Sequence, residues 1–436
     1  MRIMRLTPYM TIDNEKFYSN NKTGFGRTCW DITKNWSNDD ETFVMTLEKN
    51  LPRKINDIKF IKISRFHLFS PSNFKQLIKG YKFYKKYAKK RKKTSGKEFI
   101  QILSMIRAFL LFNAIKKAIR KVNPDIIHIH GIVPECIPFI DAARSIGIPY
   151  MINLHGVVTA TNHTYIFGNN WEKDILSHLS LANDKLIFIS NGIQQYINID
   201  FKVKFSDENT KVIINGCRNN TSDLLESEII DLRKKLLGEG KNILLISVGA
   251  ITLDKGQRRI IEAINVIDST IKQQIHLLII GLGDDIEYCK ELVKTYNLQT
   301  NISFLGYVDN TLLMHYYRSS DLLVQATSGP GFSRMYWEAF MNGIPAIACK
   351  LQPGIYDIYD PNTMILSEDF SPKEIANTIY NALFKKWNRE NIIRYSLRCD
   401  WHAKCDEYKS FATNIINNHD FNRKALLIND LIEDTR

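Results

Sequence analysis

Two glycine-containing stretches in the second half of the chain have the composition of phosphate-binding loops. The first runs from Gly249 to Gly256, directly after the apolar run 242–248, and carries Lys255. Small residues let the backbone approach an anion, the start of a helix offers N–H groups, and a lysine adds a positive charge. Arg258 follows inside the predicted helix. The stretch predicts a diphosphate site, although an ordinary tight turn has the same composition.

The second stretch spans residues 328–345 and predicts a glycine-rich loop that leads into a helix ending at Gly343. Glu338 would lie about one turn inside that helix, where a carboxylate can accept hydrogen bonds from a ribose diol. A surface glutamate is the alternative for this residue. The loop residues expected beside the same ligand are Gly331, Phe332, Ser333 and Arg334.

Three histidines of the first half, His128, His130 and His155, fall at the predicted ends of two strands. A polar cluster at this place suits hydrogen bonding to a hydroxyl group of a bound sugar or of a second substrate, and we favour His155 for that role. No carboxylate follows at ligand spacing, so the histidines do not predict a metal site. Core or cleft histidines are the simpler interpretation.

The elements that position these residues are short β-branched runs alternating with amphipathic stretches. This pattern is typical of parallel sheets built from βαβ units, whose ligands bind beyond the carboxyl ends of the strands. The predicted strands are 2–6, 42–47, 125–130, 150–155, 185–190 and 211–215 in the first half, and 242–248, 276–280, 302–305, 321–325 and 346–348 in the second. The predicted fold class is α/β, with two Rossmann-like doubly wound domains.

The length of 436 residues exceeds what one hydrophobic core usually serves. Turn residues at Asn215-Gly216 and the polar stretch after them mark the boundary. We expect an N-terminal Rossmann-like domain over 1–218, a C-terminal Rossmann-like domain over 224–395, and a helical segment over 396–436 that packs back toward the first domain.

The composition, 44% hydrophobic and 24% charged, is that of a globular protein. Seven scattered cysteines without a CxxC pair argue against a disulfide framework or a structural zinc site, and favour a reducing cytosol. The first ten residues are too short and interrupted for a signal peptide, and no apolar run reaches the length of a membrane span. We expect a cytoplasmic protein, soluble or peripheral.

Much of the formal charge of +13 lies between Lys75 and Lys97, where eleven positions are Lys or Arg and none is acidic. Aromatic and apolar residues are interleaved at near-helical spacing. Such a helix can lie on an anionic membrane at the inner face, with each Lys or Arg contributing about 1 kcal/mol. A solvated surface helix, or one whose aromatic side faces the core, is the alternative, and nucleic acid is not an expected partner.

Several motifs resemble those of the family 4 glycosyltransferases of the GT-B fold, and the resemblance covers most of the chain. The second-half stretches resemble the family's V-G-R-L-x-x-x-K-G and E-G-F-G-x-x-x-x-E-A-M-A-x-G-x-P motifs. The other matching stretches are Asp125–Gly131 (a histidine-containing strand end), Pro149–Gly156 (a strand ending in His-Gly), Asn215-Gly216 (a turn), Ile279–Gly283 (I-G-x-G), Ile302–Val308 (V-x-F-L-G-x-V), and Trp401 with Tyr408 (W-x6-Y).

The resemblance implies two domains facing each other across a cleft, and retaining transfer from a nucleotide-diphosphate sugar to a glycan or lipid-linked acceptor, as in cell-surface polysaccharide synthesis. It implies no cofactor and no metal. The glycine-rich stretch Thr23–Arg27 resembles the family's acceptor-side loop and is expected to precede a helix. The implied catalytic residues are His155, Lys255 and Glu338. The implied donor-binding residues are Gly249, Lys255, Arg258, Val308, Gly331, Phe332, Ser333, Arg334 and Glu338. The implied acceptor-side residues are Gly24, Gly26, His130 and His155.

Two departures from the family pattern fall at the donor site. Pro330 stands where the family has the first Glu of its E-x7-E motif, and Ala250 stands where it has the Arg of G-R-L. Proline supplies no carboxylate for a sugar hydroxyl, and alanine removes one cation. Arg334, where the family commonly has an apolar residue, could restore the charge. A GT-B protein that binds nucleotide sugars without catalysis, or a GT-B-like sugar-nucleotide epimerase, are the alternative functions.

Overall fold

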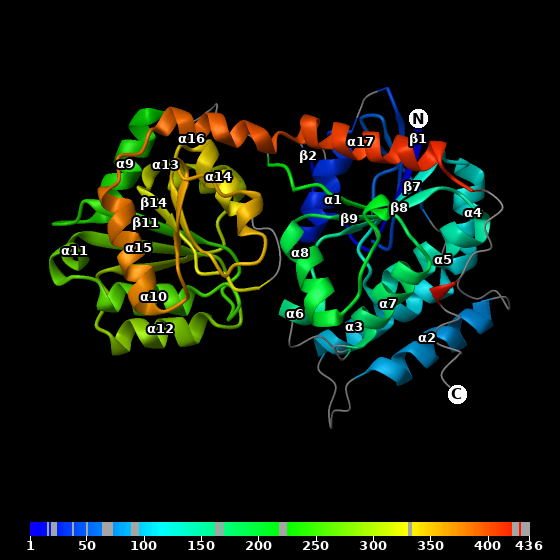
Figure 1. Cartoon of the computed structure of the whole chain (residues 1–436), viewed down its shortest axis with the longest axis horizontal. Helices are drawn as coiled ribbons and strands as arrows, with labels where there is room; N and C mark the ends of the chain where they lie inside the picture. The colour runs from blue at the N-terminus through cyan, green and yellow to red at the C-terminus, as the bar shows by residue number, and fades with distance from the viewer. Residues whose placement is uncertain are drawn as a thin grey trace. The chain divides into compact units, whose positions relative to one another are not determined.

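The computed structural model contains two compact units (Figure 1). One comprises Met1–Ile214 with Trp401–Arg436, and the other comprises Asn215–Asp400. The structure describes residues 1–14, 17–18, 24–36, 39–48, 51–62, 73–88, 96–161, 167, 170–217, 225–329, 334–420 and 427–428.

The first unit is built on a mainly parallel sheet with the strand order β10-β9-β8-β7-β1-β4-β6-β5. Only β5 runs antiparallel to its neighbour. The chain starts at β1 and adds strands first on one side and then, from β7, on the other, so the order reverses between β1 and β7. The strands are β1 (Arg2–Thr7), β4 (Glu41–Thr46), β5 (Lys54–Ile55), β6 (Ile58–Phe60), β7 (Ile126–His130), β8 (Tyr150–Leu154), β9 (Leu186–Phe188) and β10 (Thr210–Val212), with a separate pair β2 (Asp13–Asn14) and β3 (Phe17–Tyr18).

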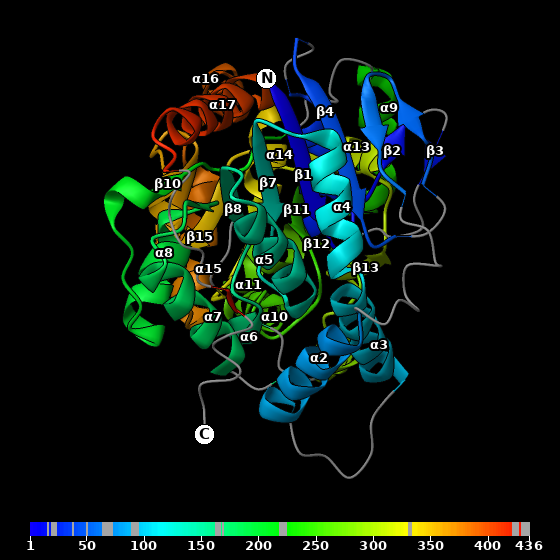
Figure 2. The ribbon, with the colours of Figure 1, turned by 90° about the vertical axis from the view of Figure 1, so that its right-hand side faces the viewer.

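Helices cover the sheet of the first unit (Figure 2). They are α1 (Gly24–Lys34), α2 (Phe74–Tyr87), α3 (Gly96–Leu110), α4 (Phe112–Val122), α5 (Ile137–Ile146), α6 (Val158–Thr161), α7 (Asn170–Leu181), α8 (Asn191–Tyr196) and α17 (Trp401–Asn417), with short turns of helix at Pro134–Cys136, Ile197–Phe201 and Asp207–Asn209. The last helix, α17, buries Trp401 and Tyr408 in one cluster with Ile3, Ile126 and Ile187 of the sheet. The end of the described chain therefore completes the core of the first unit.

The second unit has a six-stranded parallel sheet in the order β13-β12-β11-β14-β15-β16. The strands are β11 (Ile243–Val248), β12 (Ile275–Ile280), β13 (Ile302–Gly306), β14 (Leu322–Val324), β15 (Ala346–Cys349) and β16 (Met364–Ser367). The helices are α9 (Glu226–Leu237), α10 (Gln257–Val266), α11 (Ser269–Gln274), α12 (Ile286–Thr295), α13 (Asn310–Ser319), α14 (Met335–Met341), α15 (Pro372–Phe384) and α16 (Arg389–Ser396), with short turns at Ile355–Asp357 and Leu397–Cys399. The strand order reverses between β11 and β14.

The α/β fold class predicted from the sequence is confirmed. Each predicted strand corresponds to a strand of the structure, and the ends agree within two residues except at β10, which ends three residues before the predicted strand 211–215. The prediction missed β16, whose four residues are followed by the polar stretch before α15, and the short β5–β6 pair. The predicted basic helix over 75–97 is shorter in the structure. Helix α2 ends at Tyr87, because the next residue, Ala88, has an extended backbone. Residues 89–95 lie outside the described residues.

Within the described residues, no single helix has the length and apolar composition needed to cross a membrane. One bent pair, Phe99–Leu110 with Phe112–Val122, meets the length and composition test only when its two parts are taken together.

The reversal point of the second sheet depends on one close backbone approach. Gly256 has φ 75° and ψ 25°, and a Cβ atom added there would lie 2.3 Å from the carbonyl oxygen of Ala326. Glycine is thus required twice at this position, for its left-handed backbone and for the absence of a side chain. The contact holds the loop after β11 against the loop after β14.

Replacing Gly256 with alanine tests this contact, and Gly147 offers a matched control. Gly147 has nearly the same backbone, φ 79° and ψ 23°, but no atom within 4 Å of an added Cβ. We expect Gly147→Ala to cost about 1–2 kcal/mol of unfolding free energy from backbone strain alone. Gly256→Ala should cost at least about 2 kcal/mol more because backbone atoms must move. Urea unfolding of the unit that holds each residue measures both, and equal losses would contradict the contact.

Candidate functional site

The candidate donor site lies at the carboxyl ends of β11 and β14, where the strand order reverses. Ligands of open α/β sheets bind at such points. Besides the approach at Gly256, the amide of Ser328 donates to the carbonyl of Asp254 at 2.8 Å, and Arg259 Nη1 donates to the carbonyl of Ala326 at 2.9 Å. The two stretches that the sequence suggested separately are therefore held side by side.

Lys255 occupies the tight turn before α10. The amides of Lys255 and Gly256 both donate to the carbonyl of Thr252, at 3.1 and 3.2 Å, and Thr252 Oγ1 donates to Asp254 Oδ1 at 2.7 Å. The lysine is half-buried, and burial lowers its pKa while Asp254 acts in the opposite direction. A diphosphate bound here would compensate the Lys255 ammonium group for the water that burial removes. The residue that caps α10 is a glycine without a side chain, so the first-turn N–H groups can face such an anion.

The two arginines that follow Lys255 are directed by other partners. Arg258 makes two bonds to Asp285, at 2.9 and 2.5 Å, and lies over the ring of Tyr288. Arg259 lies over Phe370 and donates to the backbone after β14. In this structure Arg258 thus ties α10 to α12. The carboxylate of Asp285 thus neutralises the cationic group of this expected donor residue.

Glu338 is anchored by a residue that the sequence did not suggest. Its Oε2 accepts a hydrogen bond from the hydroxyl of Tyr317 at 3.0 Å, and Tyr317 is fully buried in α13. Burial, together with the negative charge of Glu338, raises the pKa of Tyr317 well above its ordinary value, so the phenol stays neutral and donates. The half-buried carboxylate in α14 is therefore held in one orientation.

The remaining donor residues divide into two groups. Gly249 directly follows β11 and takes part in a close contact with Gly281, since a Cβ on Gly281 would lie 1.9 Å from the carbonyl oxygen of Gly249. Val308 follows β13 and is half-buried, and Arg334 precedes α14. Pro330, Gly331, Phe332 and Ser333 lie outside the described residues. Gly281, in the I-G-x-G stretch, thus allows the backbone after β12 to pack closely against the backbone after β11.

Several polar atoms at the same reversal point are buried without a hydrogen-bond partner in the described part of the chain. They are Gln257 Oε1, Gln325 Oε1 and Thr327 Oγ1, while Gln325 Nε2 donates to the carbonyl of Val248 at 3.1 Å. Buried polar atoms are almost always paired, so these atoms indicate a place for a polar ligand or ordered water. Sequence patterns do not reveal such atoms.

The first unit brings His130 and His155 together at the ends of β7 and β8. His130 Nδ1 lies 3.1 Å from His155 Nε2, and Asn153 Nδ2 lies 3.1 Å from the same atom. The ring of Phe25 packs edge-on against His155 at 4.8 Å. Burial lowers the pKa of His155 to about 3, so its imidazole is neutral at neutral pH. It is suited to hydrogen bonding with a hydroxyl and is a weak proton acceptor.

The structure corrects the expected position of His128. It lies in the middle of β7 instead of at its end, fully buried, with Nδ1 2.6 Å from Arg5 Nη1 and its ring 5.5 Å from Tyr408. Because arginine only donates, His128 accepts at Nδ1 and carries its proton on Nε2. The guanidinium of Arg5 also lies over Trp36 at 4.5 Å. The predicted strand 125–130 ends at the same residue as β7, so His128 lies two residues inside both, where the side chain is covered by the core.

A second correction concerns the glycine-rich stretch near the N-terminus. Gly24 and Gly26 do not precede the helix, because α1 begins at Gly24, and Thr23 lies outside the described residues. Thr28 Oγ1 donates to the carbonyl of Gly24 at 3.1 Å and ties the first turn together. Phe25, between the two glycines, contacts His155. The first turn of α1 is thus placed beside the histidine pair.

Cys29, His130 and His155 could offer ligand atoms to a metal, since one atom of each lies within 4.8 Å of the others. The set does not fit a divalent cation well. Burial raises the pKa of the Cys29 thiol and so opposes the thiolate that a metal would need. Burial also lowers the pKa of His130, and the buried guanidinium of Arg5 adds to this shift as a positive charge. The same charge would oppose a cation.

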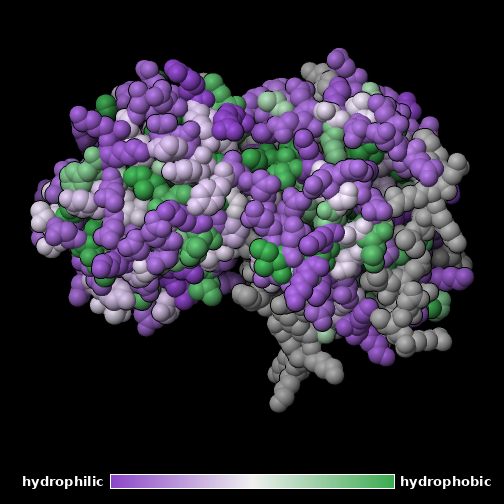
Figure 3. Space-filling view, viewed as in Figure 1, coloured by the Kyte–Doolittle hydropathy of each residue, from purple (hydrophilic) through white to green (hydrophobic). Residues whose placement is uncertain are grey.

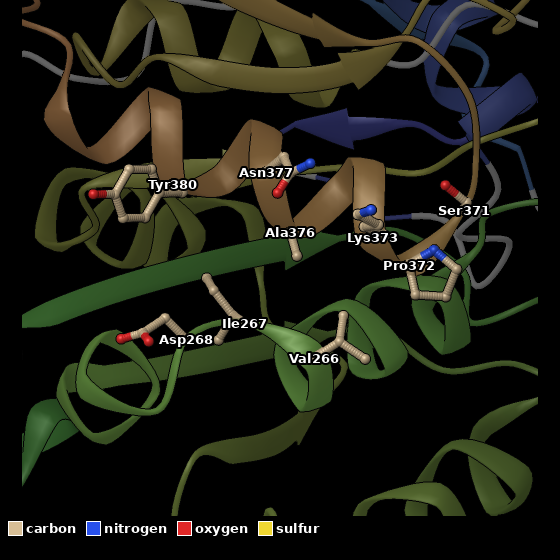
Figure 4. A pocket seen from close by; sticks show the side chains of 9 residues that line it. All are labelled: Val266, Ile267, Asp268, Ser371, Pro372, Lys373, Ala376, Asn377 and Tyr380. Atoms are coloured by element: carbon tan, nitrogen blue, oxygen red, sulfur yellow. The ribbon is translucent and has the colours of Figure 1, made fainter.

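A pocket of the second unit lies outside the loop pair that forms the candidate donor site. Figure 4 shows it between the end of α10 and the first half of α15, lined by Ile267 and Asp268 on one side and by Lys373, Asn377 and Tyr380 on the other. None of the predicted donor residues lines this pocket. The candidate donor site is therefore the loop pair at the reversal point.

Comparison with known families follows the division of the chain. Residues 41–218 match the glycosyltransferase family 4 model, and residues 228–398 match the glycosyl transferases group 1 model. The chain belongs to the family 4 glycosyltransferases. An uncharacterized glycosyltransferase of Methanocaldococcus jannaschii is 28% identical to it over 256 residues, which are 57% of this chain and 62% of that relative. The match thus spans less than two thirds of the relative's length.

Solved structures of low sequence identity share the GT-B fold. The structure of Anabaena HepE in complex with UDP and glucose matches 95% of this chain and 100% of its own, with a TM-score of 0.66 and 17% identity. The lipopolysaccharide outer core galactosyltransferase WaaB, in its apo form, matches 95% and 99%, with a TM-score of 0.62 and 15% identity. At these identities the likeness concerns the fold.

Sequence reasoning missed the residues that orient this family 4 chain's candidate groups: Tyr317, Asn153, Phe25 and Arg5. Only Arg5 left a signal, because a charged residue inside the apolar run 2–6 is unusual for a buried strand. The others have ordinary residue types at ordinary positions. Their roles depend on contacts between distant parts of the chain.

The depressed pKa of His155 makes stability depend on pH. An unfolded histidine, with its ordinary pKa of 6.5, binds a proton below that pH, whereas folded His155 stays neutral down to about 3. Unfolding therefore takes up a proton in this window, and the unfolding free energy falls as the pH falls. In His155→Asn we expect this slope to be shallower by up to about 1.4 kcal/mol per pH unit.

Urea unfolding at several pH values between about 4.5 and 6 measures the slope of the unfolding free energy against pH. In this range the unfolded histidine is largely protonated and folded His155 is neutral. His402→Asn, an exposed histidine of α17, is the control for loss of a histidine as such. An unchanged slope in His155→Asn would mean that the folded imidazole is protonated.

Proposed function

We propose that the chain transfers a sugar from a nucleotide-diphosphate sugar to a glycan or lipid-linked acceptor with retention of configuration, as a hexosyltransferase of cell-surface polysaccharide synthesis. The observation that carries this proposal is the loop pair at the β11–β14 reversal point, which brings the turn of Lys255 against the loop after β14. Glu338 follows that loop in α14. The family membership and the UDP and glucose bound to HepE support the proposal.

In the proposed reaction, the bond between the sugar C1 and the diphosphate oxygen breaks as the acceptor oxygen bonds to C1 from the same face. The acceptor proton passes to an oxygen of the leaving diphosphate, so no protein base is needed. Lys255 and the first-turn amides of α10 stabilise the charge that develops on the diphosphate. His155, neutral at neutral pH, would orient a hydroxyl of the sugar or the acceptor. The proposed transfer requires no metal ion or cofactor.

The proposal places the protein in the cytoplasm, at the inner face of the membrane where a lipid-linked acceptor would be found. Incubating the purified chain with labelled nucleotide sugars in EDTA, with and without lipid-linked acceptors, tests it. A labelled glycolipid with the donor's anomeric configuration is the expected product. Conversion of the donor without acceptor would instead favour an epimerase, and donor binding without any product would favour a catalytically degenerate protein.

Lys255→Ala tests the diphosphate assignment. We expect kcat/KM for the nucleotide sugar to fall about 10²–10³-fold, the usual effect of removing one group that stabilises developing negative charge. Lys290→Ala is the matched control, because Lys290 lies on exposed α12 and pairs with Glu287. Steady-state kinetics on both variants make the comparison. Unchanged kinetics in Lys255→Ala would reject the assignment.

Glu338→Gln tests the ribose assignment. Loss of a charged acceptor for the ribose diol should weaken nucleoside diphosphate binding about 10-fold or more. Calorimetry with the matching 2′,3′-dideoxy nucleoside diphosphate is the control, because this ligand has no hydroxyl for the carboxylate to bind. The dideoxy ligand should bind more weakly than the ribose ligand, and its affinity should be the same for Glu338→Gln as for the unchanged chain. An equal loss for the two ligands would mean that Glu338 acts elsewhere.

A further inference from the structure

The outer side of α2 carries a row of exposed apolar residues. Phe74, Ile78 and Tyr81 are 65%, 40% and 60% exposed, and their spacing of four and three residues places them on one stripe of the helix. Phe83 and Tyr87 lie on the opposite side and are buried. The sequence suggested one aromatic side for this helix, whereas the structure divides the aromatic residues between the core and the surface.

The neighbouring helix α3 repeats this arrangement. Phe99, Ile100 and Leu103 are exposed, while Met105 and Phe109 are buried. With 3.6 residues per turn, the exposed residues lie on the side away from the buried ones. A helix with an apolar outer side in addition to its packed side is unusual in a soluble protein, because a second apolar side has no partner within the fold.

The two helices pack against each other (Figure 2). A Cβ on Gly80 would lie 3.2 Å from the ring of Phe109, and the rings of Phe83 and Phe109 are 6.4 Å apart. The contact uses the buried sides, so the exposed rows are left on the outside of the pair. Because the buried sides face each other, the two exposed rows point away from each other, and we call the α2 row of Phe74, Ile78 and Tyr81 the outer apolar surface.

Elsewhere in the described part of the chain the exposed apolar side chains are mostly scattered, apart from adjacent pairs such as Tyr380 and Phe384 on α15. The face of the molecule in Figure 3 is mostly hydrophilic, with apolar side chains in small patches. Single exposed residues such as Leu181 and Ile199 are common on soluble proteins and need no partner. Two adjacent helices that each expose a row are different.

Positive charge accompanies the outer apolar surface. Helix α2 contains five lysines and no acidic residue, and Lys75, Lys82, Lys85 and Lys86 are exposed. On a helical projection, Lys75 and Lys82 lie together along one edge of the row formed by Phe74 and Ile78. An apolar stripe bordered by lysines is complementary to an anionic bilayer, whose acyl boundary takes the apolar side chains and whose phosphates take the ammonium groups. A second copy of the chain would instead bring lysines against lysines.

We propose that α2 docks on an anionic membrane surface, lying in the plane of the bilayer with the outer apolar surface entering the headgroup boundary. The inference rests on the proposed function for its purpose, which is to bring the site to a lipid-linked acceptor. It adds an apolar contribution to the purely electrostatic attraction expected from the basic segment. Binding should therefore weaken with salt without being abolished.

Vesicle co-sedimentation in the absence of any nucleotide sugar tests the proposal. The probes are vesicles of phosphatidylcholine alone and of phosphatidylcholine mixed with phosphatidylglycerol. The full chain should bind the mixed vesicles and retain part of that binding at high salt. Phe74→Ser/Ile78→Ser/Tyr81→Ser should lower the partition coefficient at least about tenfold at both salt concentrations, because three apolar side chains leave the boundary. Lys75→Gln/Lys82→Gln/Lys85→Gln should lower it chiefly at low salt.

Leu181→Ser/Ile199→Ser is the matched control, since both residues are more than 70% exposed in the same unit but lie outside the surface. It should bind as the unchanged chain does. Circular dichroism and calorimetric binding of a nucleoside diphosphate verify that each variant is folded, and they separate failure of docking from failure of the proposed transfer. Equal vesicle binding by the apolar triple variant, or no binding to mixed vesicles, would overturn the proposal. A dimer of the unchanged chain in light scattering that is absent in the apolar triple variant would also overturn the proposal, in favour of a protein interface.

Discussion

The candidate donor site depends on the close approach of two backbone segments at the reversal point of the second sheet. The loop after β11 can touch the loop after β14 only because Gly256 has no side chain and adopts a left-handed conformation. The hydrogen bond from Ser328 to Asp254 and that from Arg259 to Ala326 use the same proximity. Without it, the turn of Lys255 and the stretch leading to Glu338 would belong to separate surfaces.

A different constraint governs the first unit, where polar groups are buried between strands. Arg5 lies inside β1 with its charge directed at His128 and the ring of Trp36. Burial and this charge keep His128 and His130 neutral, and burial does the same for His155. Neutral imidazoles can form hydrogen bonds without the desolvation cost of buried cations. The arrangement suits recognition of hydroxyl groups more than proton transfer.

The helices of the first unit differ in how they use their apolar residues. Helix α17 fills the core with Trp401 and Tyr408, so its apolar residues are satisfied within the fold. Helices α2 and α3 satisfy only one side of each helix and leave the other side apolar. Because the lysines of α2 border that side, charge and apolar surface act together at one place. Composition alone reports the charge and cannot report the second apolar side.

The sequence by itself determined the α/β class, most of the strands and the turn of Lys255, because β-branched runs and glycine turns are local patterns. Motif resemblance also identified the family before any geometry was known. Only the tertiary structure decided that Tyr317 anchors Glu338, that Arg258 pairs with Asp285, and that His128 is a core residue. These contacts join residues on different elements, 21, 27 and 123 positions apart. They are set by how helices pack on the sheets, which no local pattern encodes.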